Sequence, residues 1–331
     1  MTLFTSYFIV VMKAAFISSA PSNISRVYGT DETARLAANA DLLPGVFSKE
    51  DALAGRLADV EALFSTWGMP VFTEEEIATC LPKLKALFYA AGATDAFVRP
   101  FLARGIDVMS AWRSNAVPVA EYCQAQILLA LKGYFRNVRE GRACRGRAPA
   151  GPGIFGESVA LLGDGAVAHC LQDRLATSNI RVTMIPSKPH ERTVSFEEAF
   201  KSAFVVSNHL PDRDDNIACI GRAHFASMRE GATFINTGRG RQIDEAALID
   251  VMSSRPDLTA LLDVTWPEPP AKDSPLWTLP NVIITSHIAG SLGDEVRRMA
   301  TSAIDDFIAY ASSGQTGPNF VREEMLITSA R

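Results

Sequence analysis

The sequence lacks the features that mark membrane, secreted and nucleic-acid-binding proteins. No segment reaches the roughly 18–20 consecutive apolar residues of a membrane span, and the apolar residues 1–12 lack the basic region and cleavage site of a signal peptide. The formal net charge is −5, and no basic stripe runs along the chain, which argues against a nucleic-acid surface. We therefore expect a cytoplasmic protein that binds neither membranes nor nucleic acid.

Cysteine is scarce as well. The five cysteines lie far apart, without the short spacings of a metal site, and none is placed to act as a nucleophile. An odd number of cysteines in a chain of this length indicates reduced thiols, and we expect no metal centre.

The 331 residues are enough for two domains, and the composition, 47% hydrophobic and 21% charged, is typical of a globular protein. Strand-like residues directly follow Met12, which makes this methionine a candidate natural start, with 1–11 as an extension.

Strand and helix patterns alternate along the chain in two series. In the first 115 residues, strand-like runs (14–18, 60–64, 84–89) alternate with helical stretches (31–40, 49–57, 74–80). The second series has strand-like runs at 157–162, 180–185, 204–207, 233–236, 260–264 and 282–284. Strands that alternate with helices predict βαβ units and parallel sheets. A last helix is expected over 294–312.

The longest helical pattern begins at Pro118, a residue suited to a first helical turn, and ends near Gly141. Its apolar residues cover much of the circumference of the helix. Such a helix is buried. We expect it to pack against a second subunit, so that 118–141 forms the interface of a homodimer.

The strand-like run that ends at Leu162 leads into Gly163-Asp164-Gly165-Ala166-Val167-Ala168 and then into a helical stretch, 169–175. This is the context of a dinucleotide cradle: a strand, a tight glycine turn, and a helix N-terminus whose free N–H groups face a pyrophosphate. We predict that Gly163, Gly165, Ala166 and Val167 contact the cofactor. The alternative is a strand–helix turn that binds nothing.

Two features depart from the usual cradle. Asp164 stands between the glycines, where an acid repels a pyrophosphate unless its side chain points away. The second strand usually ends in an acid that binds the ribose, about 20 residues after the cradle, but no Asp or Glu occurs in 174–190. Ser187 and Lys188 follow that strand instead and are candidates to bind a 2′-phosphate. The cofactor is therefore NAD or NADP, with a lean to NADP, unless Lys188 is simply a solvated loop residue.

Three residues near the ends of later strands have the chemistry to act on a 2-keto acid. The Arg239 guanidinium is suited to bind a substrate carboxylate bidentately and to polarise the adjacent carbonyl. His287 follows a strand, where ligands bind in open α/β sheets, and its imidazole is able to protonate the alkoxide that forms in reduction. Glu268 is a candidate to hydrogen-bond His287 and fix its tautomer. Each residue alone also fits a non-catalytic role (a turn arginine, a structural histidine, a solvated glutamate), so the assignment depends on all three together.

Four segments of the chain resemble the D-isomer-specific 2-hydroxyacid dehydrogenase family. They are Ser114-Asn115-Ala116-Val117-Pro118-Val119-Ala120-Glu121, Phe234 through Gly240, Asp263 through Pro269, and His287 with its neighbours, although Ser286 replaces the usual proline. The resemblance covers most of the chain from about Leu81 to Ser312.

The resemblance implies a fold and a set of roles. The fold would be two doubly wound parallel-sheet domains, with a Rossmann coenzyme domain (116–312) inserted into a flavodoxin-like substrate domain (1–115 and 313–331). Arg239 would bind substrate, His287 would be the acid/base and Glu268 would be its partner. Backbone around Ala91, Gly92 and Ala93 would bind the substrate carboxylate. The contacts to the cofactor would come from His209, Pro211, Thr237, Asp263 and His287, with Asp263 holding the nicotinamide amide.

These observations predict an NAD(P)-dependent oxidoreductase that acts on a CH–OH group. It would reduce a small 2-keto acid, of the glyoxylate or hydroxypyruvate type, to the D-2-hydroxy acid. Two alternatives stay open: a catalytically weak cofactor-sensing protein similar to the family's corepressor members, and a dehydrogenase of another small anion such as formate or phosphite. Trp112 and Arg113 stand where the family often has Pro-Gly, and Trp112 either narrows the substrate pocket or belongs to the core.

Overall fold

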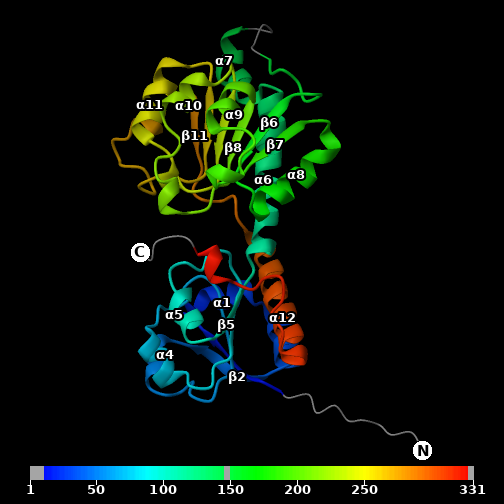
Figure 1. The fold of residues 1–331 in the computed structure, drawn as a ribbon, viewed down its shortest axis with the longest axis vertical. Helices are drawn as coiled ribbons and strands as arrows, with labels where there is room; N and C mark the ends of the chain where they lie inside the picture. Colours follow the sequence, from blue (N-terminus) through cyan, green and yellow to red (C-terminus); the bar gives the residue numbers. More distant parts are fainter. Residues whose placement is uncertain (1–10, 145–149, 327–331) are drawn as a thin grey trace, which may run out of the picture. The chain divides into compact units, whose positions relative to one another are not determined.

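The chain folds into two compact units, each built around a parallel sheet (Figure 1). The structure, a computed structural model, describes residues 11–144 and 150–326. One unit consists of Met1–Asn115 and Leu292–Arg331, and the other, Ala116–Ser291, is inserted into it. The α/β class predicted from the alternating pattern is confirmed. Residues 1–10, which make up most of the expected extension before Met12, lie outside the described residues.

The first unit contains a five-stranded sheet in the order β2-β1-β3-β4-β5, and every pair of neighbours is parallel. This order, 2-1-3-4-5, is the flavodoxin-like arrangement of a doubly wound sheet. The strands are β1 (Lys13–Ile17), β2 (Asp41–Phe47), β3 (Ala62–Ser65), β4 (Ala86–Tyr89) and β5 (Asp107–Ser110).

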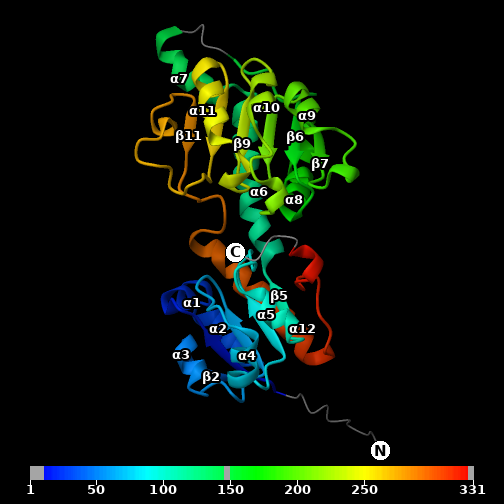
Figure 2. The same ribbon diagram turned by 60° about the vertical axis from the view of Figure 1, so that its left-hand side comes forward.

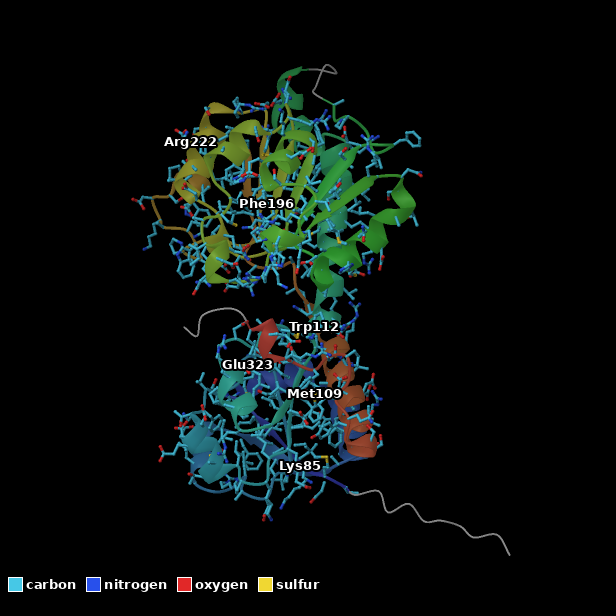
Figure 3. All side chains as sticks on the ribbon, in the orientation of Figure 1. Lys85, Met109, Trp112, Phe196, Arg222 and Glu323 are labelled. Carbon is cyan, nitrogen blue, oxygen red and sulfur yellow. The ribbon has the colours of Figure 1, made fainter. Side chains whose placement is uncertain are left out.

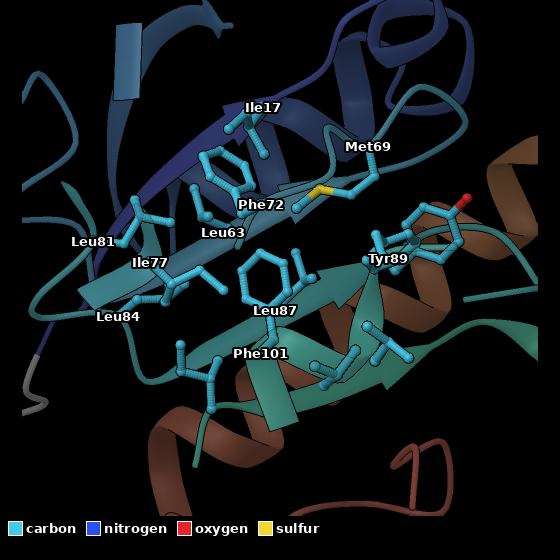
Figure 4. Close-up of a cluster of buried hydrophobic side chains, with 14 of the residues drawn as sticks. Ile17, Leu63, Met69, Phe72, Ile77, Leu81, Leu84, Leu87, Tyr89 and Phe101 are labelled. Atoms are coloured by element: carbon cyan, nitrogen blue, oxygen red, sulfur yellow. The ribbon is translucent and has the colours of Figure 1, made fainter. Parts of the chain in front are cut away.

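The strands β1, β3 and β4 are buried on both faces, which explains why they read as continuous apolar runs. On β3 the side chains alternate, so that Leu63 packs into one core and Phe64 into the other. The Leu63 core is completed by helices that include α4 (Glu74–Cys80) and α5 (Val98–Ala103). Figure 4 shows this core, where the rings of Phe72 and Phe101 lie edge to face with centroids 6.0 Å apart.

The Phe64 face is covered by α1 (Pro21–Val27), α2 (Thr30–Ala37) and α12 (Val296–Ser313). The expected helix 294–312 was assigned to the coenzyme domain, and that assignment was wrong. Phe307 of α12 packs edge to face against Phe64 and Phe88, with centroids 5.3 and 5.4 Å apart. The apolar face of α12 therefore belongs to the first unit, which the chain re-enters at Leu292.

The second unit contains a six-stranded parallel sheet in the order β11-β10-β9-β8-β6-β7 (Figure 2). Its strands are β6 (Ser158–Leu162), β7 (Arg181–Ile185), β8 (Val205–Asn208), β9 (Thr233–Asn236), β10 (Thr259–Leu262) and β11 (Val282–Ile284). The winding direction reverses between β6 and β8, and open α/β sheets bind ligands beyond the carboxyl ends of the strands at such a switch point.

Helices cover both faces of the second sheet as well, and side chains fill the layers between (Figure 3). The helices on one face are α6 (Trp112–Leu131) and α8 (Ala166–Leu175). The other face carries α9 (Phe196–Ser202), α10 (Arg222–Ser227) and α11 (Glu245–Ser254). This arrangement places the glycine turn after β6 directly before the first turn of α8.

The long helix differs from the prediction at both ends. It begins at Trp112, so Pro118 lies inside the helix and not in its first turn. It stops at Leu131, and a separate helix, α7 (Tyr134–Cys144), follows. Gly133 separates the two helices, and its φ is +72°. A β-carbon on residue 133 would lie 2.3 Å from the backbone nitrogen of Gly151, so the position requires glycine.

Candidate active site

The predicted functional residues of the second unit lie where its strands end. Gly163 follows β6, Arg239 follows β9, Asp263 directly follows β10, and His287 comes three residues after β11. All these strands run parallel in one sheet, so their carboxyl ends lie along the same edge of it. The fold thus brings residues more than 120 positions apart to the same edge.

The cradle after β6 has the geometry that a dinucleotide requires. Gly163 is buried with φ of +105°, and a β-carbon there would come within 2.6 Å of the His209 carbonyl oxygen. Gly165 caps α8 without a side-chain hydrogen bond, and a β-carbon on it would meet no described atom within 4 Å. The first N–H groups of α8 therefore face open space, which suits a pyrophosphate. Asp164 is exposed to solvent.

The end of β7 holds a cluster of charged residues. Lys188 Nζ lies 3.1 Å from Glu191 Oε1, an acid just beyond the 174–190 segment that contains none. Arg192 donates to the carbonyl oxygens of Pro186 (2.9 Å) and Ser187 (2.6 Å), which fixes the loop. A phosphate at Lys188 would have to compete with Glu191, so the geometry at the end of β7 does not confirm the expected lean to NADP.

His209 sits in a small polar cluster behind the cradle. Its two ring nitrogens lie 2.9 Å from Ser207 Oγ and 3.2 Å from Thr237 Oγ1. Thr237 also contacts the thiol of Cys123 on α6, at 3.4 Å. Burial lowers the pKa of His209, so the ring is neutral, with one nitrogen donating and the other accepting. The cluster joins the ends of β8 and β9, which carry the predicted cofactor contacts His209, Pro211 and Thr237.

The loop that presents Arg239 is built around a buried amide network that the sequence analysis did not identify. Gln242 is fully buried, and its Oε1 accepts from the Asn208 side chain (2.7 Å) and from the Arg239 backbone (3.0 Å). Its Nε2 donates to the carbonyl oxygens of Leu210 (3.0 Å) and Pro211 (2.8 Å). One side chain thus ties the loop after β8 to the loop after β9.

The glycines on either side of Arg239 are required by close packing. A β-carbon on Gly240 would lie 1.9 Å from the backbone of Thr265, and one on Gly238 would lie 2.7 Å from Gln242. The arginine itself is partly exposed, and its Nη1 donates to the Gly238 carbonyl oxygen at 2.8 Å. The two glycines therefore let the loop pack closely against Thr265 and Gln242 while the Arg239 guanidinium remains accessible.

An acid that the sequence analysis did not identify accompanies the arginine. Asp212 Oδ2 lies 3.8 Å from Arg239 Nε, and its Oδ1 accepts from Arg241 Nε at 2.6 Å. Asp214 lies 3.7 Å from the same Arg241. Two guanidinium groups and two carboxylates thus stand together, so this part of the edge carries little net charge.

His287 and Glu268 form the expected pair. Nδ1 of the imidazole lies 2.7 Å from Glu268 Oε1, which fixes the tautomer and leaves Nε2 for another partner. Both side chains are about half exposed, 52% for the histidine and 41% for the glutamate. A cavity of about 440 Å³ lies beside Glu268 and is lined also by Asp263, Trp277 and Thr285. An imidazole held in this way is equipped to give a proton to, or take one from, a bound ligand.

Asp263 is occupied by protein donors. Its two carboxylate oxygens accept from the backbone N–H groups of Ile288 (2.8 Å) and Ala289 (2.9 Å), and Oδ1 also accepts from Thr285 Oγ1 (2.7 Å). The side chain is buried, with 3% of its surface exposed. A carboxylate has about four acceptor positions, so one remains for the nicotinamide amide that the resemblance assigns to it.

The remaining predicted contacts lie in the first unit, on the loop after β4. The Ser110 hydroxyl lies 2.8 Å from the carbonyl oxygen of Ala91 and 2.7 Å from that of Gly92, and it holds the loop at the carboxyl end of the sheet. Ala93 is exposed. Trp112 is partly buried and stacks against the Arg113 guanidinium, 4.6 Å from the ring centroid.

Two further observations concern the described residues as a whole. Within them, no helix is long and apolar enough to span a membrane. No group of three or more His, Cys, Asp or Glu side chains in that part of the chain is arranged to hold a metal ion.

Comparison with known proteins identifies the family. The family model described as "D-isomer specific 2-hydroxyacid dehydrogenase, NAD binding domain" matches residues 126–289. The chain belongs to this family. A glyoxylate reductase from Korarchaeum cryptofilum is 27% identical over 286 residues, which are 82% of this chain and 85% of that protein.

Other relatives of this dehydrogenase-family chain have different names. A D-3-phosphoglycerate dehydrogenase from Archaeoglobus fulgidus is 30% identical over 219 residues, which are 63% of this chain but 41% of that protein. The chain thus spans less than half the length of this relative. A solved phosphoglycerate oxidoreductase from Rhizobium etli superposes with a TM-score of 0.79 at 19% identity, over 95% of this chain and 99% of that one. This likeness shows the same fold.

Proposed function

We propose that this protein is an NAD(P)-dependent oxidoreductase that reduces a small 2-keto acid, of the glyoxylate or hydroxypyruvate type, to the D-2-hydroxy acid. The observation that carries the proposal is the 2.7 Å pair of His287 and Glu268, on the sheet edge that also presents Arg239. The relative named glyoxylate reductase, which this chain matches over 85% of its length, supports the substrate class.

The residues divide the work of the reaction. The open N-terminus of α8 and the backbone at Gly163 and Gly165 would hold the pyrophosphate of the cofactor, whose nicotinamide supplies the hydride. Arg239 would bind the substrate carboxylate and stabilise the charge that forms on the carbonyl oxygen. Nε2 of His287 would donate the proton to that oxygen and leave the ring neutral, and the Glu268 carboxylate on Nδ1 would stabilise the protonated ring before the transfer.

The charges beside Arg239 favour a substrate with a single carboxylate. Asp212 and Asp214 already balance Arg239 and Arg241 in this unit. The contact between Asp212 and Arg239 is loose, at 3.8 Å, so the carboxylate of the substrate would replace Asp212 as the partner of Arg239. A phosphorylated keto acid would bring a second anionic group for which this part of the second unit has no unmatched cation, which supports the glyoxylate type over the phosphoglycerate type.

The test is the initial rate of nicotinamide oxidation with a panel of 2-keto acids that includes glyoxylate, hydroxypyruvate and a phosphorylated analogue, with NADH and NADPH in parallel. We expect turnover with the unphosphorylated acids. His287→Asn should lower kcat by orders of magnitude and change nucleotide affinity much less. The φ of residue 287 is +55°, in the left-handed region that asparagine tolerates, but the asparagine side chain transfers no proton.

Each failure has a distinct meaning. An unchanged kcat in His287→Asn would remove the acid role. Nucleotide binding without turnover on any acid would favour the cofactor-sensing alternative, and turnover of formate or phosphite alone would reassign the substrate.

We also propose that the protein is a homodimer through α6 and α7. Leu129, Tyr134 and Val138 support this, because they expose 40%, 49% and 54% of their surface along these helices. Light scattering of the purified protein gives the mass that tests it.

A further inference from the structure

His287 lies in a backbone conformation that L-residues rarely adopt. Its φ is +55°, in the left-handed region, where a non-glycine residue costs about 1 kcal/mol. The surrounding structure must therefore hold the turn. The His287 N–H donates to the Asp263 carbonyl oxygen (3.0 Å), and the next two N–H groups donate to the Asp263 carboxylate at 2.8 and 2.9 Å.

The carboxylate that holds this turn is itself held from behind. Thr285 Oγ1 lies 2.7 Å from Asp263 Oδ1 and 2.8 Å from the Tyr122 hydroxyl. The threonine has one hydroxyl proton, and the carboxylate only accepts. Thr285 must therefore donate to Asp263 and accept from Tyr122. Burial raises the pKa of Tyr122, which keeps the phenol protonated and able to donate.

The result is a directed hydrogen-bond chain from α6 to the catalytic turn. We propose that Tyr122 and Thr285 are positioning residues, which act through Asp263 to hold the left-handed turn that keeps His287 Nδ1 on Glu268. In the part of the chain that the structure describes, neither side chain hydrogen-bonds to His287 or Glu268. The inference rests on the proposed function for its kinetic consequence, because positioning of His287 matters only if the imidazole transfers a proton.

The chain predicts a graded effect of small substitutions. Thr285→Val keeps the shape of the side chain but removes both hydrogen bonds, and Thr285→Ser keeps the hydroxyl. Displacement of a catalytic group by about 1 Å costs up to ~100-fold in rate. We expect Thr285→Val to lower kcat at least tenfold, Tyr122→Phe to lower it less, and Thr285→Ser to restore it to within about threefold of the parent.

The control is Thr259→Val, the same substitution in a buried threonine. Thr259 lies at the start of β10, at the end of the strand away from Asp263. It should leave kcat within about twofold of the parent. The KM for the keto acid should stay nearly constant in all variants, because Arg239, the proposed substrate-binding residue, lies outside this hydrogen-bond chain, so that kcat changes and KM does not. A general loss of structure would instead change both parameters and would not be rescued by serine.

A second measurement does not depend on activity. Hydrogen exchange of the Ile288 and Ala289 amides should be at least tenfold faster in Thr285→Val than in the parent, and parent-like in Thr285→Ser. Unchanged exchange or an unchanged kcat in Thr285→Val would overturn the proposal. If the parent turned over none of the acids, the proposed function would fail, and the exchange rates alone would still decide whether the chain holds the turn.

Discussion

The most quantitative prediction concerns Gln242, whose side chain makes four hydrogen bonds between the loops after β8 and β9. Gln242→Met keeps the length of the side chain but leaves those four partners without their bonds. The Pro211 carbonyl oxygen keeps the hydrogen bond that it accepts from the Asn216 side chain at 2.9 Å. The other three partners are the Asn208 side chain, the Arg239 backbone N–H and the Leu210 carbonyl oxygen, and each lost bond costs about 1 kcal/mol. We expect the second unit to lose about 3 kcal/mol of its free energy of unfolding.

The loss should be visible in stability and in substrate affinity. For a unit of this size, 3 kcal/mol corresponds to a fall in Tm of roughly 10 °C. The Arg239 backbone N–H loses its acceptor, so the guanidinium becomes less fixed and the KM for the keto acid should rise. Calorimetry gives the Tm of the transition, and initial rates give the KM.

Gln124→Met is the matched control. Gln124 lies in the same unit and donates one hydrogen bond, to the Arg174 carbonyl oxygen at 3.1 Å, so its loss should cost about 1 kcal/mol or less. If Gln242→Met and Gln124→Met were equally stable, the argument from four shared bonds would be refuted.

Two further predictions concern the cofactor edge and pH. If Lys188 contacts a 2′-phosphate, Lys188→Ala should weaken NADPH binding about tenfold more than NADH binding. Glu191→Gln should strengthen NADPH binding, because it removes the carboxylate that competes for Lys188. Equal effects on both nucleotides would contradict the phosphate assignment. Burial lowers the pKa of His209 in the folded state, so the unfolded chain binds a proton below about pH 6.5 that the folded chain does not, and stability falls as pH decreases through that range. Between pH 6.5 and 5.5, the free energy of unfolding of the parent should fall by up to roughly 1 kcal/mol more than that of His209→Asn, as measured by denaturant titration. An identical pH dependence of the two proteins would contradict this assignment.

The fold class and the order of the functional segments could be predicted from sequence because both depend on local patterns. Short parallel strands such as 233–236 and 282–284 can be predicted from runs rich in β-branched and apolar residues, and the observed bounds of β9 and β11 agree with the predicted ranges. The strand–glycine–helix context of the cradle is also local, since the chemistry that suits a pyrophosphate is carried by consecutive residues.

Elements whose stability comes from distant contacts were missed. The edge strand β2 contains Pro44 and Gly45, which break the strand pattern but are tolerated where only one neighbour needs hydrogen bonds. No strand or helix is predicted from the sequence of the C-terminal tail, yet Val321 donates to the Val108 carbonyl oxygen at 2.8 Å and extends the pairing beyond β5. The placement of α12 in the first unit depends on Phe307 meeting Phe64, and no local pattern records that contact.

The sequence by itself determined the residue types of the candidate site, the two α/β units and the family. Those properties follow from side-chain chemistry and from periodicity along a few neighbouring residues. Only the tertiary structure decided how the residues work together: Asp212 lies beside Arg239, Gln242 joins two loops, and Asp263 holds the turn of His287 instead of standing free. These roles depend on hydrogen bonds between residues 25 to 163 positions apart in the sequence, and such residues come into contact only when the sheet brings the strand ends together.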